Sequence, residues 1–167
     1  ILDSSGNRPP PTFVDDSSGK TKNSAIDTDP KVQAYIDYPN QMLIKHRRGY
    51  RMQLLLPIQE VSGHSEWFNM DATSEVGDLV NAVVASLVFD DNEFLFDPSA
   101  INIYIVNGQT AGACAWGNPS SSDIIALSQS INPDWVILHE SGHYLGLPHT
   151  QDGEQFLFGP GVTCKMS

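Results

Sequence analysis

Residues 139–149 read His-Glu-Ser-Gly-His-Tyr-Leu-Gly-Leu-Pro-His, and this stretch decides the fold and the chemistry that we expect. His139 and His143 are one helical turn apart, so both imidazoles project from the same face of a helix and can hold one metal ion. Gly146 can end this helix in the left-handed conformation and bring the imidazole of His149 back toward the ion. Three neutral nitrogen ligands leave a fourth position open, which is typical of a catalytic zinc site.

Glu140 predicts the reaction that this metal would serve. Its carboxylate follows a ligand, is not needed to hold the ion, and can accept a proton from a water that the cation activates. These groups indicate hydrolysis of a peptide bond. The alternatives are ordinary histidines on a helix surface, or a degenerate protein that binds metal without catalysis.

Two main helices are predicted. Between Glu75 and Phe89, apolar residues recur at the i, i+3, i+4, i+7 spacing of an amphipathic helix. The second helix carries the histidines. It begins at Asn132 and Pro133, an N-cap followed by a proline at the first helical position, and ends at Gly146.

Four strands are predicted from short apolar or β-branched runs. A first buried strand runs from Tyr50 to Ile58, two further strands cover residues 101–106 and 124–128, and a short edge strand lies between these two at residues 113–116. The expected fold is α/β (α+β), with a mixed sheet, helices packed on it and a C-terminal loop region after the second helix.

Composition limits the possible partners. The chain has 167 residues, which suits one domain, and a formal net charge of −11, which would repel nucleic acid and anionic membrane surfaces. It contains no apolar run of about 18 residues, so no membrane-spanning helix is expected. The expected partner is a protein or peptide substrate, with no nucleic acid and no membrane, and the chain is expected to act as a monomer.

The two cysteines bear on localisation. Cys114 and Cys164 either form one disulfide, worth roughly 4 kcal/mol in the chain-entropy model, or remain free thiols. A single cysteine pair in an acidic chain of low charge content favours the disulfide and an oxidising compartment. The chain opens at Ile1 without a signal sequence, so we expect a processed, secreted protein.

The sequence of residues 139–149 resembles the pattern His-Glu-x-x-His-x-x-Gly-x-x-His of the metzincin zinc endopeptidases, and every fixed position matches. The resemblance implies that His139, His143 and His149 bind Zn²⁺, that Glu140 is the general base and that Gly146 makes the turn.

The resemblance also implies a methionine-containing turn beneath the metal. Met166 lies 17 residues after His149, in a Cys-x-Met-Ser setting similar to the reprolysin-type turn, whereas the sequence around His143 looks like the pappalysin branch. The alternative for Met166 is an arbitrary residue in a frayed C-terminus. By the same analogy, an extended substrate would pair with an edge strand formed by Gly112, Ala113, Cys114, Ala115 and Trp116.

The first 30 residues contain three consecutive prolines and few apolar positions, so we expect them to form an extended segment (1–30). The resemblance implies a mixed, mainly parallel twisted sheet with an antiparallel edge strand and a zinc cleft at the second helix. It also implies a sheet-and-helix subdomain that ends in the zinc helix (31–146) and the start of a C-terminal subdomain (147–167). Metzincins normally continue into a further helix, so we expect a truncated subdomain. The predicted function is that of a secreted zinc-dependent endopeptidase. The alternatives are an inactive zinc-binding or adhesion module, and a fragment that needs a second chain.

Two charged clusters are weaker candidates. A basic cluster indicates a site for an acidic substrate, a processing point or a solvated loop; it consists of Lys45, Arg47, Arg48 and Arg51. An oxygen-rich cluster indicates a Ca²⁺ site, although its spacing matches no EF-hand, or an ordinary polar helix end. Its members are Asp90, Asp91, Asn92, Glu93 and Asp97. The two other histidines, His46 and His64, are expected to be isolated surface or core side chains.

Overall fold

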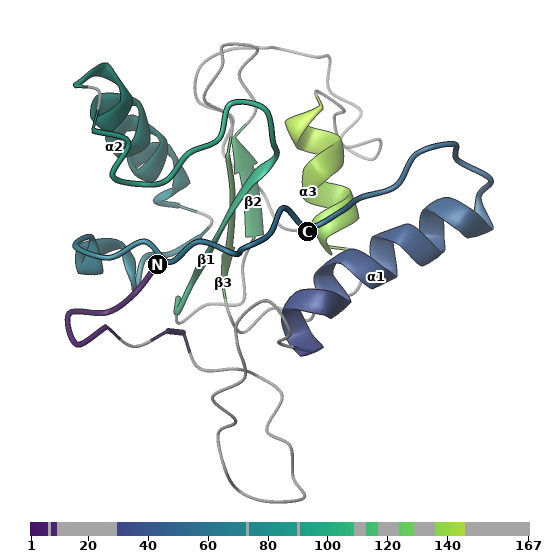
Figure 1. Ribbon diagram of the computed structural model, residues 1–167, viewed down its shortest axis with the longest axis horizontal. Coiled ribbons are helices and arrows are strands. Elements are labelled where there is room, and N and C mark those ends of the chain that lie inside the picture. The colour runs from purple at the N-terminus through teal and green to yellow at the C-terminus, as the bar shows by residue number, and fades with distance from the viewer. Residues whose placement is uncertain are drawn as a thin grey trace, which may run out of the picture.

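The computed structural model describes residues 1–6, 8–9, 30–72, 74–89, 91–108, 113–116, 124–128 and 136–145, with backbone alone at residues 30–31 and 113–116. These ranges contain the helices α1 (Pro30–Lys45), α2 (Val76–Val88) and α3 (Val136–Tyr144), the 3₁₀ helix η2 (Ser65–Trp67), and the strands β1 (Asn102–Val106), β2 (Ala113–Trp116) and β3 (Ile124–Ser128) (Figure 1). Within them, no helix has both the length and the apolar character needed to cross a membrane.

The three strands form one mixed sheet in the order β1-β3-β2. Central β3 runs parallel to β1, with Asn102 opposite Ile124, and antiparallel to β2, with Trp116 opposite the same Ile124. All five residues of β3 are buried, because helices cover both faces of the sheet. The strands predicted at 101–106, 113–116 and 124–128 are confirmed, as is the antiparallel edge position of β2.

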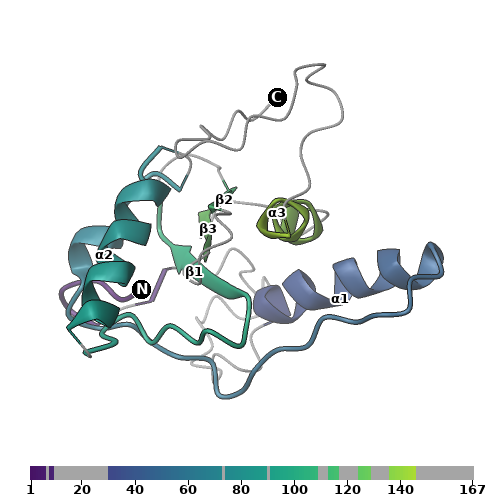
Figure 2. The same cartoon turned by 90° about the horizontal axis from the view of Figure 1, so that it is seen from above.

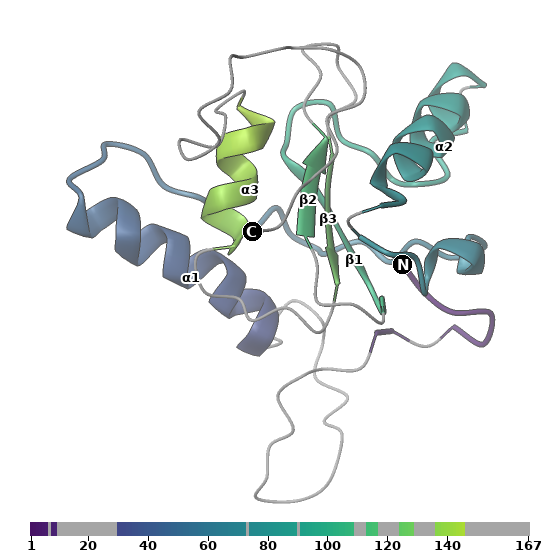
Figure 3. The ribbon, with the colours of Figure 1, turned by 180° about the vertical axis from the view of Figure 1, so that it is seen from behind.

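The sheet separates two apolar clusters. On one face, α2 packs with the segment around Met70 and with the buried aromatic side chains Phe94 and Phe96. On the other face, α3 contributes Ile137 and α1 contributes Tyr35 to a smaller cluster. Viewed from above, α2 lies on one side of the sheet and α1 and α3 on the other (Figure 2). The view from behind shows the same three layers (Figure 3).

Helix α2 matches the helix predicted between Glu75 and Phe89, since it spans Val76–Val88. Its apolar stripe faces the sheet, and the side chains of Leu79 and Val83 are completely buried. The stripe does not extend to the last residue, because Val88 is 74% exposed.

Helix α1 is a correction to the prediction of two main helices, because the described residues contain three α-helices. Pro39 lies inside α1, where a proline removes a backbone donor and usually argues against a helix. The helix forms because Tyr35, Pro39 and Leu43, spaced four residues apart, are all buried on one side of it.

The buried strand predicted from Tyr50 to Ile58 is wrong. Residues 50–58 form neither helix nor strand, and Leu55 and Leu56 are 66% and 58% exposed. The side chain of Asn40 takes the place of a partner strand: its Nδ2 donates to the carbonyl of Met52 and its Oδ1 accepts from the N–H of Met52, both at 2.8 Å. Pro57 removes a further ladder donor.

The C-terminus of α1 is a Schellman motif with an arginine at its left-handed position. The N–H of Arg48 donates to the carbonyl of Leu43 (2.8 Å), and the N–H of Arg47 donates to the carbonyl of Ile44 (2.9 Å). Arg47 has φ = 53°, a conformation in which a residue with a Cβ is strained and glycine is not.

We therefore expect Arg47→Gly to raise the free energy of unfolding by up to about 1 kcal/mol. Glycine relieves the strain of the left-handed conformation, but its greater freedom in the unfolded chain offsets part of that gain. Urea unfolding of both proteins measures the change. An Arg47→Ala variant, which keeps a Cβ, should show no such gain. Equal stability of the glycine and alanine variants would contradict the strain.

Gly108 lies two residues after the end of β1. Glycine is required there because the backbone comes close to the backbone of Met70. A Cβ at Gly108 would lie 2.7 Å from the carbonyl oxygen of Met70 and 3.3 Å from Ser128 Oγ. The hydroxyl of Ser128 donates to the Gly108 carbonyl (2.9 Å), and the N–H of Asn107 donates to the carbonyl of Phe68 (2.7 Å), so the backbone has little room to shift.

Gly108→Ala should consequently lower the free energy of unfolding by roughly 1–3 kcal/mol, the usual cost of overpacking. The melting temperature by circular dichroism checks this. Exposed Gly49, whose Cβ would meet nothing within 4 Å, provides the matched control, and Gly49→Ala should leave the melting temperature nearly unchanged. Equal effects of the two substitutions would contradict the close approach.

Candidate metal centre

Helix α3 brings two histidines into the geometry of a chelating pair. The Nε2 atoms of His139 and His143 are 3.0 Å apart, and the two rings meet edge to face with their centroids at 4.5 Å. Two nitrogen ligands of a tetrahedral zinc ion, each about 2.0–2.1 Å from the metal, lie about 3.3 Å apart. The Nε2–Nε2 distance is close to this spacing, and it is also the length of a hydrogen bond between the two rings.

Glu140 and Ser141 lie on the buried side of α3. The side chain of Glu140 is only 5% exposed although it carries an ionisable carboxyl, and a buried carboxylate is usually paired or functional. Ser141 is 2% exposed, and its Oγ has no hydrogen-bond partner among the described residues. The packing around Ser141 would therefore suit an apolar side chain.

The position of α3 against the sheet is fixed by apolar contacts and one polar contact. Ile137 packs on Ile125 and Leu127 of β3, and the hydroxyl of Tyr144 donates to the carbonyl of Ala100, just before β1, at 3.4 Å. The helix also contacts β2, and within the described sheet β2 pairs on one side alone. The histidine pair is thus carried by a helix that contacts β2, one of the two edge strands of the described sheet.

Several predicted site residues lie outside the described residues. They are Gly112, Gly146, His149, Cys164 and Met166, together with the side chains of residues 113–116. The third ligand, the turn methionine and the disulfide between Cys114 and Cys164 therefore stay predictions. In the described part of the chain, His139 and His143 are two of the ligands that a site needs, and no group of three or more His, Cys, Asp or Glu side chains forms there.

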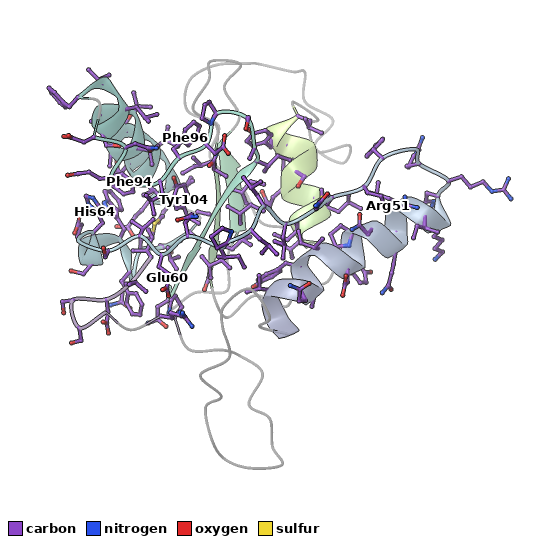
Figure 4. All side chains as sticks on the ribbon, in the orientation of Figure 1. Arg51, Glu60, His64, Phe94, Phe96 and Tyr104 are labelled. Carbon is purple, nitrogen blue, oxygen red and sulfur yellow. The ribbon has the colours of Figure 1, made fainter. Side chains whose placement is uncertain are left out.

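His64 was expected to be isolated, but it lies between two carboxylates on the α2 side of the sheet. Its Nδ1 and Nε2 are each 3.2 Å from a carboxylate oxygen, of Glu66 and Glu93 respectively, and its ring stacks on Phe94 at 4.2 Å (Figure 4). A backbone hydrogen bond and the His64 ring hold the pKa of the Glu66 carboxyl below its usual range. The sequence signal for this cluster was the spacing His-x-Glu at residues 64–66.

Two residues of the predicted calcium cluster bind their own loops. Both polar atoms of the Asn92 amide bind the backbone of Phe96, and Asp97 Oδ1 accepts from the N–H and the hydroxyl of Ser99. Glu93 instead contacts His64, Asp90 lies outside the described residues, and the calcium site stays a prediction.

Comparison of the chain with models of protein families, with curated proteins and with solved structures finds no match.

Proposed function

We propose that this chain is the catalytic domain of a secreted, zinc-dependent endopeptidase with a metzincin-like α/β fold. The observation that carries the proposal is the convergence of the Nε2 atoms of His139 and His143, 3.0 Å apart, on the helix that also holds the buried Glu140. His149 would be the third ligand, following the motif that these residues belong to. Zn²⁺ suits three imidazoles better than Ca²⁺, which prefers oxygen ligands.

The order of elements before α3 also supports the proposal. A strand, an antiparallel edge strand and a further strand precede the zinc helix in the metzincins, and β1, β2 and β3 precede α3 in the same order. An extended peptide can add to the outer side of β2 through main-chain hydrogen bonds, which align a substrate without selecting its sequence.

Each residue of this site would then have a defined role. A zinc ion bound there would supply Lewis-acid chemistry, polarising a carbonyl oxygen and favouring ionisation of water near neutral pH. Glu140 would accept the proton of the attacking water and deliver it to the nitrogen of the leaving amine. Glu140 is only 5% exposed, so its carboxylate is shielded from bulk solvent, where charge interactions are weaker.

The proposal is tested by casein hydrolysis with the metal removed and restored. We expect the protein to cleave casein, to lose this activity with a chelator such as 1,10-phenanthroline, and to regain it when Zn²⁺ is added. A calcium chelator that spares zinc should leave the cleavage unchanged. A folded protein that retains zinc but cleaves neither casein nor gelatin would contradict the proposal and favour an inactive zinc-binding module.

A further inference from the structure

The turn after α1 concentrates positive charge on an acidic protein. This basic turn, residues 45–51, carries Lys45, Arg47, Arg48 and Arg51, and no Asp or Glu occurs between residues 38 and 59. The chain has 9 Lys and Arg against 20 Asp and Glu, so removing these four cations would leave five against 20, a net charge of −15. The basic turn is therefore a positively charged segment on a protein whose net charge is negative.

The cations of the basic turn are available to a partner. All four side chains are exposed, and in the part of the chain that the structure describes none of them forms an ion pair with a carboxylate. Arg8, by contrast, is already paired with Glu60. If these cations served only to keep the protein soluble, acidic residues would be expected among them, as Glu60 lies beside Arg8.

Arg47 is kept at a position where the backbone favours glycine. Its φ of 53° is the left-handed conformation of a Schellman motif, and an arginine there is strained. Backbone strain that persists in a structure is a reason to look for a function of the side chain. The strain is accounted for if the guanidinium of Arg47 has a partner.

The basic turn also projects from the body and carries apolar surface. The turn lies at the end of α1 that is farther from the sheet (Figure 1). Ile44 and Tyr50, at either end of the turn, are 55% and 63% exposed. Cationic and apolar side chains in one short segment fit a ligand that has both anionic and apolar groups.

We propose that the basic turn binds an acidic segment of a partner protein, one in which Asp or Glu residues alternate with apolar residues. A long uniform polyanion fits less well, because beyond about 8 Å, the screening length at physiological salt, it would meet the acidic remainder of the surface. A short acidic peptide can stay on the turn, where Ile44 and Tyr50 would contact its apolar side chains.

Fluorescence anisotropy with a fluorescein-labelled peptide of alternating Glu and Leu residues tests the proposal on the whole chain. We expect Arg47→Gly to weaken binding about twofold, and the triple change Arg47→Gly, Arg48→Ser, Arg51→Ser to weaken it about tenfold, since each exposed contact contributes modestly. Binding should also weaken as salt is raised. Arg8→Ser, which removes a paired cation elsewhere, should leave the affinity unchanged.

Arg47→Gly separates binding from folding, because this variant should melt at a higher temperature while binding the peptide more weakly. Unchanged affinity in the triple variant would overturn the proposal. So would equal affinity for a Gln and Leu peptide, which lacks the charge. Tighter binding of a heparin fragment than of the Glu and Leu peptide, through the same arginines, would also overturn the proposal. The ligand would then be a sulfated polysaccharide and not a protein segment.

Discussion

Glu140→Gln should lower kcat/KM for casein by roughly 100- to 10,000-fold while zinc stays bound, the range by which a general base accelerates such a reaction. The substitution keeps the shape of a side chain that is only 5% exposed but removes its ability to accept a proton. Because glutamine has nearly the same size and shape as glutamate, we expect the variant to fold, and circular dichroism of the variant checks this. Initial rates of peptide release, with zinc quantified in the same preparation, measure the effect.

The matched control is Glu66→Gln, the same chemical change on an exposed carboxylate on the opposite face of the sheet. It should leave the cleavage rate unchanged. A Glu140→Gln protein that retains zinc and cleaves casein at the wild-type rate would show that another group accepts the proton. A variant that loses zinc would require the rate to be compared at saturating metal before the role of Glu140 is judged.

His143→Ala should lower zinc affinity by at least about 100-fold, with casein cleavage lost at equal metal concentration. About 10 kcal/mol of binding free energy shared among three ligands makes about 3 kcal/mol for each, which corresponds to more than a factor of 100. His143 is half-buried and its Nε2 lies 3.0 Å from that of His139, so the substitution removes one half of the observed pair. Competition with a fluorescent zinc chelator measures the affinity.

His46→Ala is the control for this experiment, because His46 is exposed just after α1 and contacts neither histidine of the pair. Its zinc affinity should equal that of the wild type. If His143→Ala binds zinc as tightly as wild type, the metal is held elsewhere and the assignment of α3 fails.

Local patterns explain which parts of the fold were predictable. Helix α2 and the pairing of His139 with His143 depend on the helical repeat, which acts over a single turn and is visible in the sequence. Strands β1 and β3 were found because short β-branched runs ended at turn residues, and β2 because two glycines flank it between these strands. The residues alone did not give the strand directions; the antiparallel edge strand was expected from the metzincin resemblance.

Contacts between distant residues explain the errors. The segment at residues 50–58 has the composition of a strand, but the amide of Asn40, twelve residues before Met52, binds both backbone groups of Met52. Helix α1 was missed because Pro39 argues locally against a helix, whereas the burial of Tyr35, Pro39 and Leu43 on one side of it outweighs that cost. Burial of Glu140 likewise depends on how α3 sits against the sheet, which no local pattern reports.

The most direct test of a histidine zinc site on α3 is X-ray absorption spectroscopy at the zinc edge of the zinc-loaded protein. We predict nitrogen or oxygen ligands alone, at about 2.0–2.1 Å, with the multiple-scattering pattern of three imidazoles. A sulfur ligand at about 2.3 Å would place a cysteine on the metal, and fewer than two imidazoles would exclude the pair formed by His139 and His143. Either result would contradict the catalytic site proposed for this protein.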